Sequence, residues 1–410
     1  MTRDTLESVV DEVKTAEVSD EYGPGNERWE MRPLSELMEP VLGKTPKRSE
    51  DEYWGGDIQW ASAKDISQSE TRHIYDTAEN MTEAGKEASN AKILPEGTVV
   101  VIARGATMGR VAQLGVPMTF NQTCYALDTN DELLDDYLYY AWQYVFGQVQ
   151  AVSYGTVFDT ITMKSFKDIE IPVPPLEIQK EIANYLTHID DKIENDLQTM
   201  KSLEAVGDEL FERLIVERSK DNDSNNRYKA FSEIADFPDG RSFDKEEWSD
   251  VGKPIIKISE LNSGIDSSSD RYEGEVEEVY DLSPGDVLFA WSASLGVYLW
   301  KSNRGVLNQH IYNVLPKDGF SKPFLYFSLR YSMGDFLHRS HGTTTKHINR
   351  SDLDEVKSPV GTDEHREQFK NQITPIFEKA VLCGTEVETL DEMRDTLLPK
   401  LLSGAVRIPE

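Results

Sequence analysis

Hydrophobic residues recur three or four positions apart over a long central stretch of the chain, from Leu176 to Arg218. This spacing puts them on one face of an amphipathic helix. Two prolines stand just ahead of Leu176, where a missing N–H costs nothing, and Gly207 interrupts the pattern further along. We therefore predict a long helix here, with a stripe marked by Ile182, Leu186, Ile189, Ile193 and Leu197.

The same spacing returns near the end of the chain, from Glu364 to Leu402. Its stripe includes Phe369, Ile373, Ile376, Leu390 and Leu397. Pro375 falls inside the pattern and predicts a kink or a late start of the helix. Because both stripes are narrow and separated by charged residues, we predict that the two helices pair as an antiparallel coiled coil. The alternative interpretation is that the two stripes only pack within the chain and have no further role.

Between the helical stretches the pattern changes to short β-rich runs such as GTVVVIARG, with turns between them. The polar segment SKDNDSNNR cannot form a core and indicates a domain boundary. We predict an α+β protein with two tandem β-rich domains, each followed by a long helix. The predicted order is an acidic lead-in 1–28, a first domain 29–175, a central helix 176–218, a linker 219–227, a second domain 228–361, and a C-terminal helix and tail 362–410.

The two β-rich regions repeat each other. Residues 187 positions apart match in identity, namely Gly109, Asn121, Gln122, Gly155, Thr156 and Pro172 with Gly296, Asn308, Gln309, Gly342, Thr343 and Pro359. An internal duplication explains this offset, and two copies with similar helices predict an approximate twofold relation. Such a protein can grip a partner whose own features repeat, and duplex DNA with two half-sites is the commonest long partner of that kind.

The net charge of the chain argues against a nucleic-acid partner at first. The chain has 74 acidic and 43 basic residues, a net charge of −31, whereas surfaces that bind phosphates are normally basic. Acids spread over the whole chain also fit a protein that stays hydrated in concentrated salt, where charges are screened over about 3 Å at 1 M. We interpret the acidity as the mark of a halophilic host, and it leaves the nature of the partner open.

Targeting signals are not recognisable in the sequence. No apolar run approaches the roughly 18 residues of a membrane helix, and the start, MTRDTLESVVDEVK, carries acids where a signal peptide carries bases. These features predict a soluble, cytoplasmic protein that does not enter a membrane.

Motifs for catalysis are not recognisable either. We find no GxxxxGK[ST] phosphate loop, no HExxH, and no Asp/Asn-Pro-Pro-Tyr/Phe motif of adenine methyltransferases. Cys124 and Cys383 lie far apart and have no second Cys or spaced His beside them, so neither a disulfide framework nor a zinc site is supported. The chain is predicted to hold no cofactor and to direct chemistry that partner subunits perform.

Several segments, in this order, resemble a specificity subunit of a Type I restriction-modification system. They are GKTPKRSEDEYWGGDIQWASAKDIS at 43–67, the two Asn-Gln pairs, the two Gly-Thr segments, PPLEIQKEIANYL, and LLPKLLSGAVRI at 397–408. The resemblance covers nearly the whole chain from Trp29 onward. The second copy departs from the family pattern, because FPDGRSFDKEEW replaces the GxTP…YWGG opening, with only Gly240 and Trp248 as echoes, and SPVGTDEHREQF replaces the PPLE segment.

The resemblance implies that each β-rich region is a target recognition domain reading one half of a bipartite site in double-stranded DNA. The helices would be spacers that set the distance between the halves and dock two modification subunits. The helices expected to dock them are those marked by Ile182, Leu186, Ile189, Ile193, Leu197, Phe369, Ile373, Ile376, Leu390 and Leu397. It also implies a non-catalytic chain within an adenine-specific DNA methyltransferase or Type I site-specific deoxyribonuclease complex. S-adenosylmethionine, ATP and Mg are then expected on partner subunits, and restriction or translocase subunits are further partners that such systems can carry.

Side chains that reach bases or phosphates are chiefly Arg, Lys, Asn and Gln, with small polar groups. In the first domain the candidates for DNA contact are Lys44, Thr45, Lys47, Arg48, Lys64, Arg104, Thr107, Arg110, Tyr154, Thr156 and Lys164. In the second they are Arg241, Lys257, Asn262, Ser292, Arg339, His341, Thr343, Thr344, Lys346 and His347. The segment HRSHGTTTKH is the best single candidate, and its alternative is a solvated loop.

The Asn-Gln pairs could read adenine, yet each stands at the entry of an apolar strand, so we predict that they stabilise turns. For the whole chain, a two-lobed scaffold that holds partner proteins on its helices and does not bind DNA remains the rival hypothesis.

Overall fold

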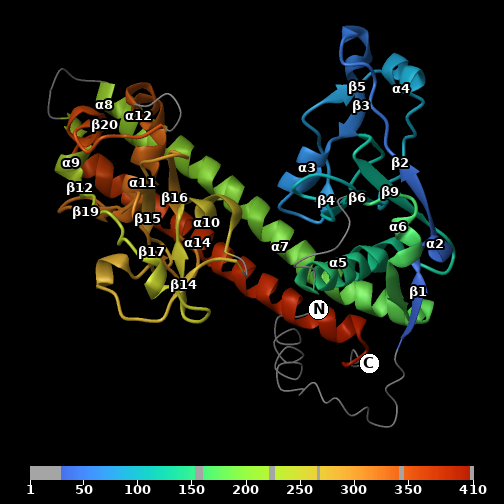
Figure 1. The fold of residues 1–410 in the computed structure, drawn as a ribbon. Helices are drawn as coiled ribbons and strands as arrows, with labels where there is room; N and C mark the ends of the chain where they lie inside the picture. The colour runs from blue at the N-terminus through green and yellow to red at the C-terminus, as the bar shows by residue number, and fades with distance from the viewer. Residues whose placement is uncertain (1–28, 153–159, 221–226, 266–267, 341–345, 407–410) are drawn as a thin grey trace. The chain divides into compact units, whose positions relative to one another are not determined.

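The computed structural model describes residues 29–152, 160–220, 227–265, 268–340 and 346–406, and the chain divides into two units. Unit 1 joins the residues up to Glu194 to those from Leu390 onward, and unit 2 is Asn195–Thr389. The long helices α7 (Leu176–Phe211) and α14 (Asp363–Leu402) each contribute one segment to each unit. Figure 1 traces the elements by colour from the blue N-terminal part to the red C-terminal helix.

Unit 1 is built on a mixed five-stranded sheet in the order β2-β9-β6-β7-β4, accompanied by the three-stranded sheet β5-β3-β8 and the antiparallel pair β1–β10. Its strands are β1 (Glu30–Pro33), β2 (Met38–Leu42), β3 (Trp54–Ala61), β4 (His73–Ile74), β5 (Asn80–Met81), β6 (Val99–Ile102), β7 (Val111–Leu114), β8 (Thr119–Phe120), β9 (Cys124–Thr129) and β10 (Glu170–Val173). Its shorter helices are α2 (Leu34–Leu37), η1 (Asp51–Tyr53), α3 (Ala63–Gln68), α4 (Glu83–Ser89), α5 (Asp135–Val152) and α6 (Ser165–Asp168).

Strand β6 lies at the centre of unit 1. Each of its four residues, Val99–Ile102, is fully buried, as expected for a continuous apolar run with both faces covered. Helix α5 brings the large buried side chains Tyr137, Tyr140 and Trp142 to the same unit. The β-rich prediction for GTVVVIARG is therefore confirmed.

Unit 2 contains two three-stranded sheets, β14-β13-β17 and β16-β15-β18, and the pairs β11–β20 and β12–β19. Its strands are β11 (Tyr228–Ala230), β12 (Ala235–Asp236), β13 (Lys253–Ile256), β14 (Arg271–Tyr272), β15 (Val287–Ala290), β16 (Gly296–Leu299), β17 (Val306–Leu307), β18 (Ile311–Asn313), β19 (Leu315–Pro316) and β20 (Lys357–Pro359). Its shorter helices are η2 (Glu212–Val216), α8 (Glu217–Lys220), α9 (Phe231–Ile234), η4 (Lys245–Glu247), α10 (Ile258–Ser263), η5 (Glu278–Tyr280), α11 (Lys322–Tyr331), α12 (Met333–Arg339) and α13 (Asp352–Glu355).

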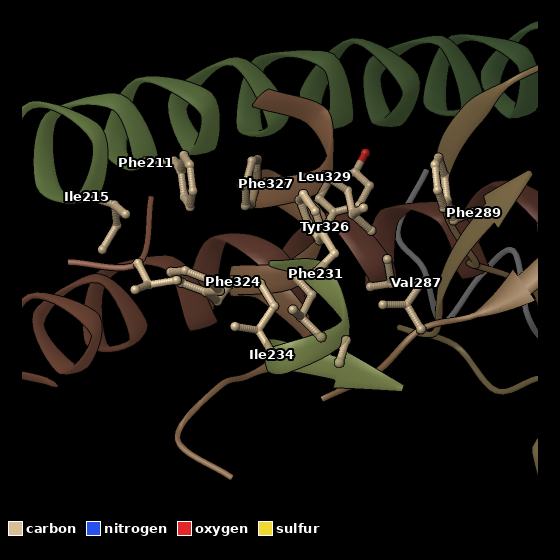
Figure 2. Packing of buried hydrophobic residues seen from close by; sticks show 14 of the residues in the cluster. Phe211, Ile215, Phe231, Ile234, Val287, Phe289, Phe324, Tyr326, Phe327 and Leu329 are labelled. Atoms are coloured by element: carbon tan, nitrogen blue, oxygen red, sulfur yellow. The ribbon is translucent and has the colours of Figure 1, made fainter. Parts of the chain in front are cut away.

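Aromatic side chains fill the core of unit 2. The ring of Phe211, at the end of α7, lies 5.5 Å from that of Phe324 in α11 and 5.6 Å from that of Phe369 in α14. Figure 2 shows Phe211 and Phe324 with other members of this core, including Phe231 and Phe289. In unit 2, the segments of α7 and α14 are thus fixed to each other and to α11 by edge-to-face ring contacts, which add to the burial of apolar area.

The segments of α7 and α14 run antiparallel, as predicted. In unit 2, Arg218 just beyond α7 donates to Gln368 near the start of α14 across 2.7 Å. Glu204 precedes Arg218 in the sequence, whereas Glu388 follows Gln368, and yet both glutamates contact the loop at 301–302. The two helices therefore run in opposite directions. In unit 1, Arg394 of α14 contacts Asp190 of α7.

The start of the first helix at Leu176 is confirmed, and helical structure continues through the π-helical turn η2 to Lys220. The late start predicted for the second helix is wrong, because α14 begins at Asp363, well before Pro375. Burial of Phe369 and Ile373 holds the turn ahead of the proline in place. The Thr374 hydroxyl also donates to the Lys370 carbonyl across 2.7 Å within the same turn.

The stripe residues of both helices face the chain's own interior. Ile182, Leu186, Ile189, Ile193, Phe369, Ile373, Leu390 and Leu397 are buried, and Leu197 and Ile376 are half-buried. These side chains hold the helices inside the two units.

The duplication is visible in the backbone hydrogen bonds. The Leu34 N–H donates to the Ile169 carbonyl across 2.9 Å, and the Phe231 N–H donates to the Val356 carbonyl across 3.4 Å. Ile169 and Val356 are 187 positions apart, as in the sequence repeat. The two β-rich regions therefore share local structure where their sequences differ.

Candidate nucleic-acid interface

A cationic loop follows the second strand of each unit, and the two loops are held in the same way. The Gly43 N–H donates to the Cys124 carbonyl across 3.1 Å, and the Lys44 N–H donates to the Phe120 carbonyl across 2.9 Å. In unit 2, the Gly240 N–H donates to Ile311 across 3.0 Å and the Arg241 N–H to Leu307 across 2.9 Å. Lys44 and Arg241 are therefore structural equivalents.

Both loops require glycine at their first position. A Cβ on residue 43 would lie 2.0 Å from the Asn121 carbonyl oxygen, and one on residue 240 would lie 2.1 Å from that of Asn308. Real Cβ atoms do not approach backbone so closely, so only glycine allows the loop to pass the Asn-Gln turn. The loop with the first positive side chain is thus placed beside that turn in each unit.

In unit 1 the loop is fastened by two tryptophans. The Trp60 indole N–H donates to the Lys44 carbonyl across 2.8 Å, and that of Trp54 donates to the Lys47 carbonyl across 3.3 Å. The guanidinium carbon of Arg48 lies 4.1 Å from the centre of the Trp54 ring and 4.8 Å from that of Trp60. Arg48 also forms an ion pair with Glu79.

The exposed ammonium groups of Lys44 and Lys47 complete this loop, and Thr45 is half-buried. The Thr45 hydroxyl contacts the Gln122 side chain, which joins the loop directly to the Asn-Gln turn. The Asn121 side chain accepts from the Thr123 N–H across 3.0 Å and from its hydroxyl across 2.6 Å. The prediction that the pair stabilises a turn is confirmed for Asn121.

The turn after β6 lies next to these groups. The Ala103 N–H donates to the Thr123 carbonyl across 2.8 Å, and the Ile161 N–H donates to the Ala103 carbonyl across 2.7 Å. Arg104, exposed, follows immediately. Thr107 is half-buried and its carbonyl accepts from the Arg110 N–H across 3.2 Å.

Arg110 links this turn to α3, because its guanidinium donates to the Ser67 carbonyl across 2.5 Å. Lys64 stands exposed on the same helix. Lys164 is exposed just ahead of α6, a few residues beyond Ile161. The described candidates of unit 1 therefore lie on adjoining segments that are tied together by hydrogen bonds.

Unit 2 repeats this arrangement around Trp291. The Trp291 N–H donates to the His310 carbonyl across 3.2 Å, and the Ile348 N–H donates to the Trp291 carbonyl across 2.8 Å. The Ala293 N–H donates to the Lys346 carbonyl across 2.9 Å, and Ser292 pairs with His347 as an isolated bridge. Three of the predicted residues, Ser292, Lys346 and His347, are thus brought together.

Two further cations of unit 2 lie against aromatic rings. The guanidinium carbon of Arg241 lies 4.7 Å from the Phe243 ring centre and 4.9 Å from that of Tyr272, and Arg241 pairs with Glu247.

The Lys257 ammonium lies 4.3 Å from the Trp248 ring centre and pairs with Asp270. Asn262, on α10, accepts from the Tyr298 hydroxyl across 2.8 Å. The Asn308 N–H donates to the Ile256 carbonyl across 3.1 Å, which places Lys257 next to the Asn-Gln turn.

The charges of the Arg241–Glu247 pair stabilise each other. Burial lowers the pKa of the Arg241 guanidinium, but the neighbouring Tyr272 hydroxyl and Glu247 carboxylate outweigh it, so this pKa lies above its ordinary value. The pKa of Glu247 lies below its ordinary value, first because the Asp244 N–H donates to it across 3.0 Å and then because Arg241 is adjacent. Glu247 therefore stays ionised at neutral pH.

Some candidates stand apart or outside the described part. Arg339, at the end of α12, pairs with Glu355 of α13, and no described hydrogen bond joins it to the loops above. Tyr154, Thr156, His341, Thr343 and Thr344 lie outside the described residues. Half of the segment HRSHGTTTKH, residues 341–345, lies outside the described part.

Sequence reasoning missed Arg350, a mostly exposed arginine close to the Trp291 cluster. Its guanidinium lies 3.8 Å from Asp239, whose other oxygen accepts from the Trp291 indole N–H across 2.9 Å. A single arginine in a polar stretch gives no sequence signal of its own. Its position three residues beyond His347 was the available clue.

The described residues offer no metal centre, since no group of three or more His, Cys, Asp or Glu among them could hold an ion. Cys124 and Cys383 are both buried free thiols. In the described ranges, none of the helices is long and apolar enough to cross a membrane.

Comparison with known proteins also finds two copies of one domain in the chain. The family model for the Type I restriction modification DNA specificity domain matches residues 26–205 and again 224–373. The MjaIX specificity subunit of a Type I restriction enzyme from Methanocaldococcus jannaschii is 25% identical over 415 residues, covering 93% of this chain and 94% of the relative. The HindI specificity subunit from Haemophilus influenzae is 24% identical over 335 residues, covering 62% and 73%.

One solved structure is similar over nearly the whole chain. It is the crystal structure of the S subunit of a Type I restriction-modification system from M. genitalium, with a TM-score of 0.55 at 20% sequence identity, covering 95% of this chain and 99% of that one. This is a likeness of fold. It agrees with two β-rich regions combined with long helices.

Proposed function

This chain belongs to the family of Type I restriction-modification DNA specificity subunits, and on that premise we propose that each of its β-rich regions reads one half of a bipartite DNA site. In this proposal, residues 29–175 and 228–361 are the two target recognition domains. The stretches 176–218 and 362–410 are spacers, 219–227 is a linker and 1–28 is a lead-in.

The observation that carries the proposal is the equivalence of Lys44 and Arg241. Each follows an obligatory glycine and stands beside an Asn-Gln turn at the same place in its unit. The net charge of the chain is −31, yet both copies have a positive side chain at this place. This supports a role for positive charge at both positions. Phosphate contacts by Lys and Arg position a protein on DNA, and donors to base edges give it specificity.

The loops supply donors of both kinds. Lys44, Lys47, Lys64, Arg104, Lys164 and Lys346 are exposed and form no ion pair with a described residue. Their freedom suits them to phosphate. Arg48, Arg241 and Lys257 are oriented by aromatic rings, which limits their rotamers and suits contacts of defined geometry with either a phosphate or a base edge.

The helices have two proposed roles. They set the distance between the two half-sites, and their outward faces dock two modification subunits, with restriction or translocase subunits as further partners. S-adenosylmethionine, ATP and Mg then act on those partners, and this chain supplies sequence specificity without catalysis. The modification would be methylation of adenine.

We test this with single-molecule methylation mapping of genomic DNA from the host, with and without the gene. Loss of one bipartite adenine-methylated motif on deletion is expected. Replacement of residues 29–175 by the same region of a relative should change one half of the motif and leave the other half unaltered. The rival hypothesis, a scaffold that holds partner proteins without reading DNA, predicts an unchanged motif in both experiments.

The spacer role has its own test. Removal of one heptad, 199–205, from α7 should shorten the unspecified gap between the two halves, because a shorter helix brings the two domains closer along the duplex. Methylation mapping reports the gap directly. A motif with both halves present and its gap unchanged would contradict the proposal that the helices set the distance between the half-sites.

A further inference from the structure

Every candidate cation that lies within about 5 Å of an aromatic ring centre is also held by a carboxylate. Arg48 pairs with Glu79, Arg241 with Glu247, and Lys257 with Asp270. Among the other candidates, Lys44 and Lys346 form no described ion pair, whereas Arg339 pairs with Glu355 without a described ring beside it. Pairing with a carboxylate is therefore common to the three cations that lie against rings, although it is not confined to them.

We propose that Glu79, Glu247 and Asp270 are built-in competitors of DNA phosphate, which occupy these cations in the free protein and are displaced when DNA binds. The inference rests on the proposed function and adds a regulatory role for acidic side chains within the interface. Their effect is to weaken binding to DNA of arbitrary sequence, where charge is the main attraction.

Orientation of the cations does not require these carboxylates. The Arg48 guanidinium is already held between the Trp54 and Trp60 rings, which themselves meet edge to face at 5.1 Å. The Arg48 and Glu79 side chains are 52% and 48% exposed, so a phosphate can reach the pair from solvent. Exchange of one anion for another at this site is sterically open.

Arg241 gives a second reason to expect exchange. Its Nη1 is buried and has no hydrogen-bond partner among the described residues, although Glu247 binds Nη2. A buried donor without a partner costs free energy, so the pair with Glu247 leaves part of the hydrogen-bonding capacity of the Arg241 guanidinium unused. A phosphate that displaces Glu247 from Nη2 offers several acceptor oxygens, and it could bind both N–H groups once the displacement uncovers Nη1.

The test compares DNA binding by the full-length chain and by Glu79→Gln and Glu247→Gln variants. The probe is a labelled duplex of arbitrary sequence, and the dissociation constant is measured by fluorescence anisotropy over a KCl series. Each variant should bind up to about fivefold more tightly, because an exposed ion pair that opposes binding has been removed. The plot of log K against log salt should steepen by about 0.9 per variant, since one more phosphate is neutralised without a carboxylate left behind.

Matched controls separate this effect from a change in net charge. Glu50→Gln and Glu246→Gln remove the same charge close by, from side chains that form no hydrogen bond or ion pair with a described residue. These controls should shift binding clearly less than their paired neighbours. In an Arg48→Ala or Arg241→Ala background, the corresponding glutamine substitution should have no more effect than the control substitution nearby.

The outcomes distinguish this inference from the function on which it rests. Tighter binding that requires the partner arginine supports the competitor role. Binding that is unchanged or weaker in the glutamine variants overturns it, while loss of affinity in Arg48→Ala and Arg241→Ala would leave the DNA interface standing. If the wild-type chain fails to bind duplex at every salt concentration, or if the arginine variants bind as well as wild type, the interface itself is refuted.

Discussion

Arg394 of α14 donates to Asp190 of α7 across 3.0 Å, which joins the two long helices inside unit 1. Asp190 is only 7% exposed, and its other oxygen accepts from the Tyr140 hydroxyl across 2.6 Å. The aspartate is therefore a buried charge whose compensation comes from one arginine and one hydroxyl. Breaking a buried pair by removing one partner costs more than the pair contributes, because the remaining charge is left without compensation.

We predict that Arg394→Met destabilises the protein by about 3 kcal/mol, the lower end of the range for a broken buried pair, since the arginine side chain is itself 25% exposed. The measurement is the shift of the urea unfolding curve. Arg213→Met is the control, because Arg213 is exposed and its loss should change stability by less than about 0.5 kcal/mol. Equal effects of the two substitutions would contradict the role assigned to the Arg394–Asp190 pair.

Gly207 gives a second prediction, because it lies against a ring in the core of unit 2. A Cβ at this position would come within 2.1 Å of the Phe327 ring, and Phe327 is only 2% exposed. Gly207→Ala should therefore destabilise unit 2 by about 1–3 kcal/mol through overpacking, although alanine favours helix. Gly334→Ala in α12 is the matched control.

A side chain added at Gly334 would meet nothing within 4 Å. That variant should keep the stability of the wild type or gain up to about 1 kcal/mol from helix propensity. Thermal unfolding of the two variants provides the comparison. If Gly207→Ala is as stable as Gly334→Ala, the close approach of α7 to Phe327 is not needed for the fold.

The order of domain and helix could be predicted from sequence because it depends on regular patterns. The start of α7 at Leu176 follows from a change of period and two prolines, which are local signals. The apolar spacing from Glu364 onward also predicted where α14 begins, to within a residue of Asp363, but it did not predict that the helix would start so far ahead of Pro375 without delay. Pro375 disfavours helix locally, yet the burial of Phe369 and Ile373 against the rest of unit 2 outweighs this preference.

Only part of the candidate site could be predicted from the sequence. The repeat of the Asn-Gln pairs correctly marked turns at equivalent places, since such turns need particular residues. The partners of Arg48 and Arg241 could not be predicted. Arg48 meets Glu79 only because β3 and β5 bring distant positions together, and the sequence contains 74 acidic residues among which the right one cannot be chosen.

Alkaline pH should weaken the fold, because a buried thiol and a buried tyrosine hydroxyl must stay protonated in the native protein. Burial raises the pKa of the Cys124 thiol from 9.0 to about 12. Burial, and then the charge of Asp239, raises the pKa of Tyr312 from 10.0 to about 12. Because both groups lose protons more readily in the unfolded chain, their contribution to stability is complete below about pH 9 and is lost as pH rises toward 12.

Denaturation midpoints measured across this range should therefore fall steadily with increasing pH. Cys124→Ala should reduce the slope at the alkaline onset, because it removes the group with the lower pKa in the unfolded state. The Cys124 thiol of the native protein should also react slowly with alkylating reagents at neutral pH. A native thiol that titrates near its ordinary pKa would refute this prediction.

The equivalence of Lys44 and Arg241 leads to the sharpest prediction about DNA. Because they stand at the same place in different units, each should affect a different half-site. If Arg241 reads a base edge, Arg241→Ala should relax the preference at one position of one half by about 1–3 kcal/mol. If Lys44 contacts phosphate, Lys44→Ala should weaken binding uniformly and reduce the salt slope by about one unit.

Methylation mapping in cells that carry each variant distinguishes these cases, because it reports both halves of the motif at once. Lys92→Ala is the control, since Lys92 is an exposed lysine of unit 1 outside the loops at 43–50 and 104–110. It should leave the motif and the extent of methylation unaltered. A change in both halves caused by Arg241→Ala alone would mean that the units do not read independently, and the assignment of one half-site to each unit would have to be abandoned.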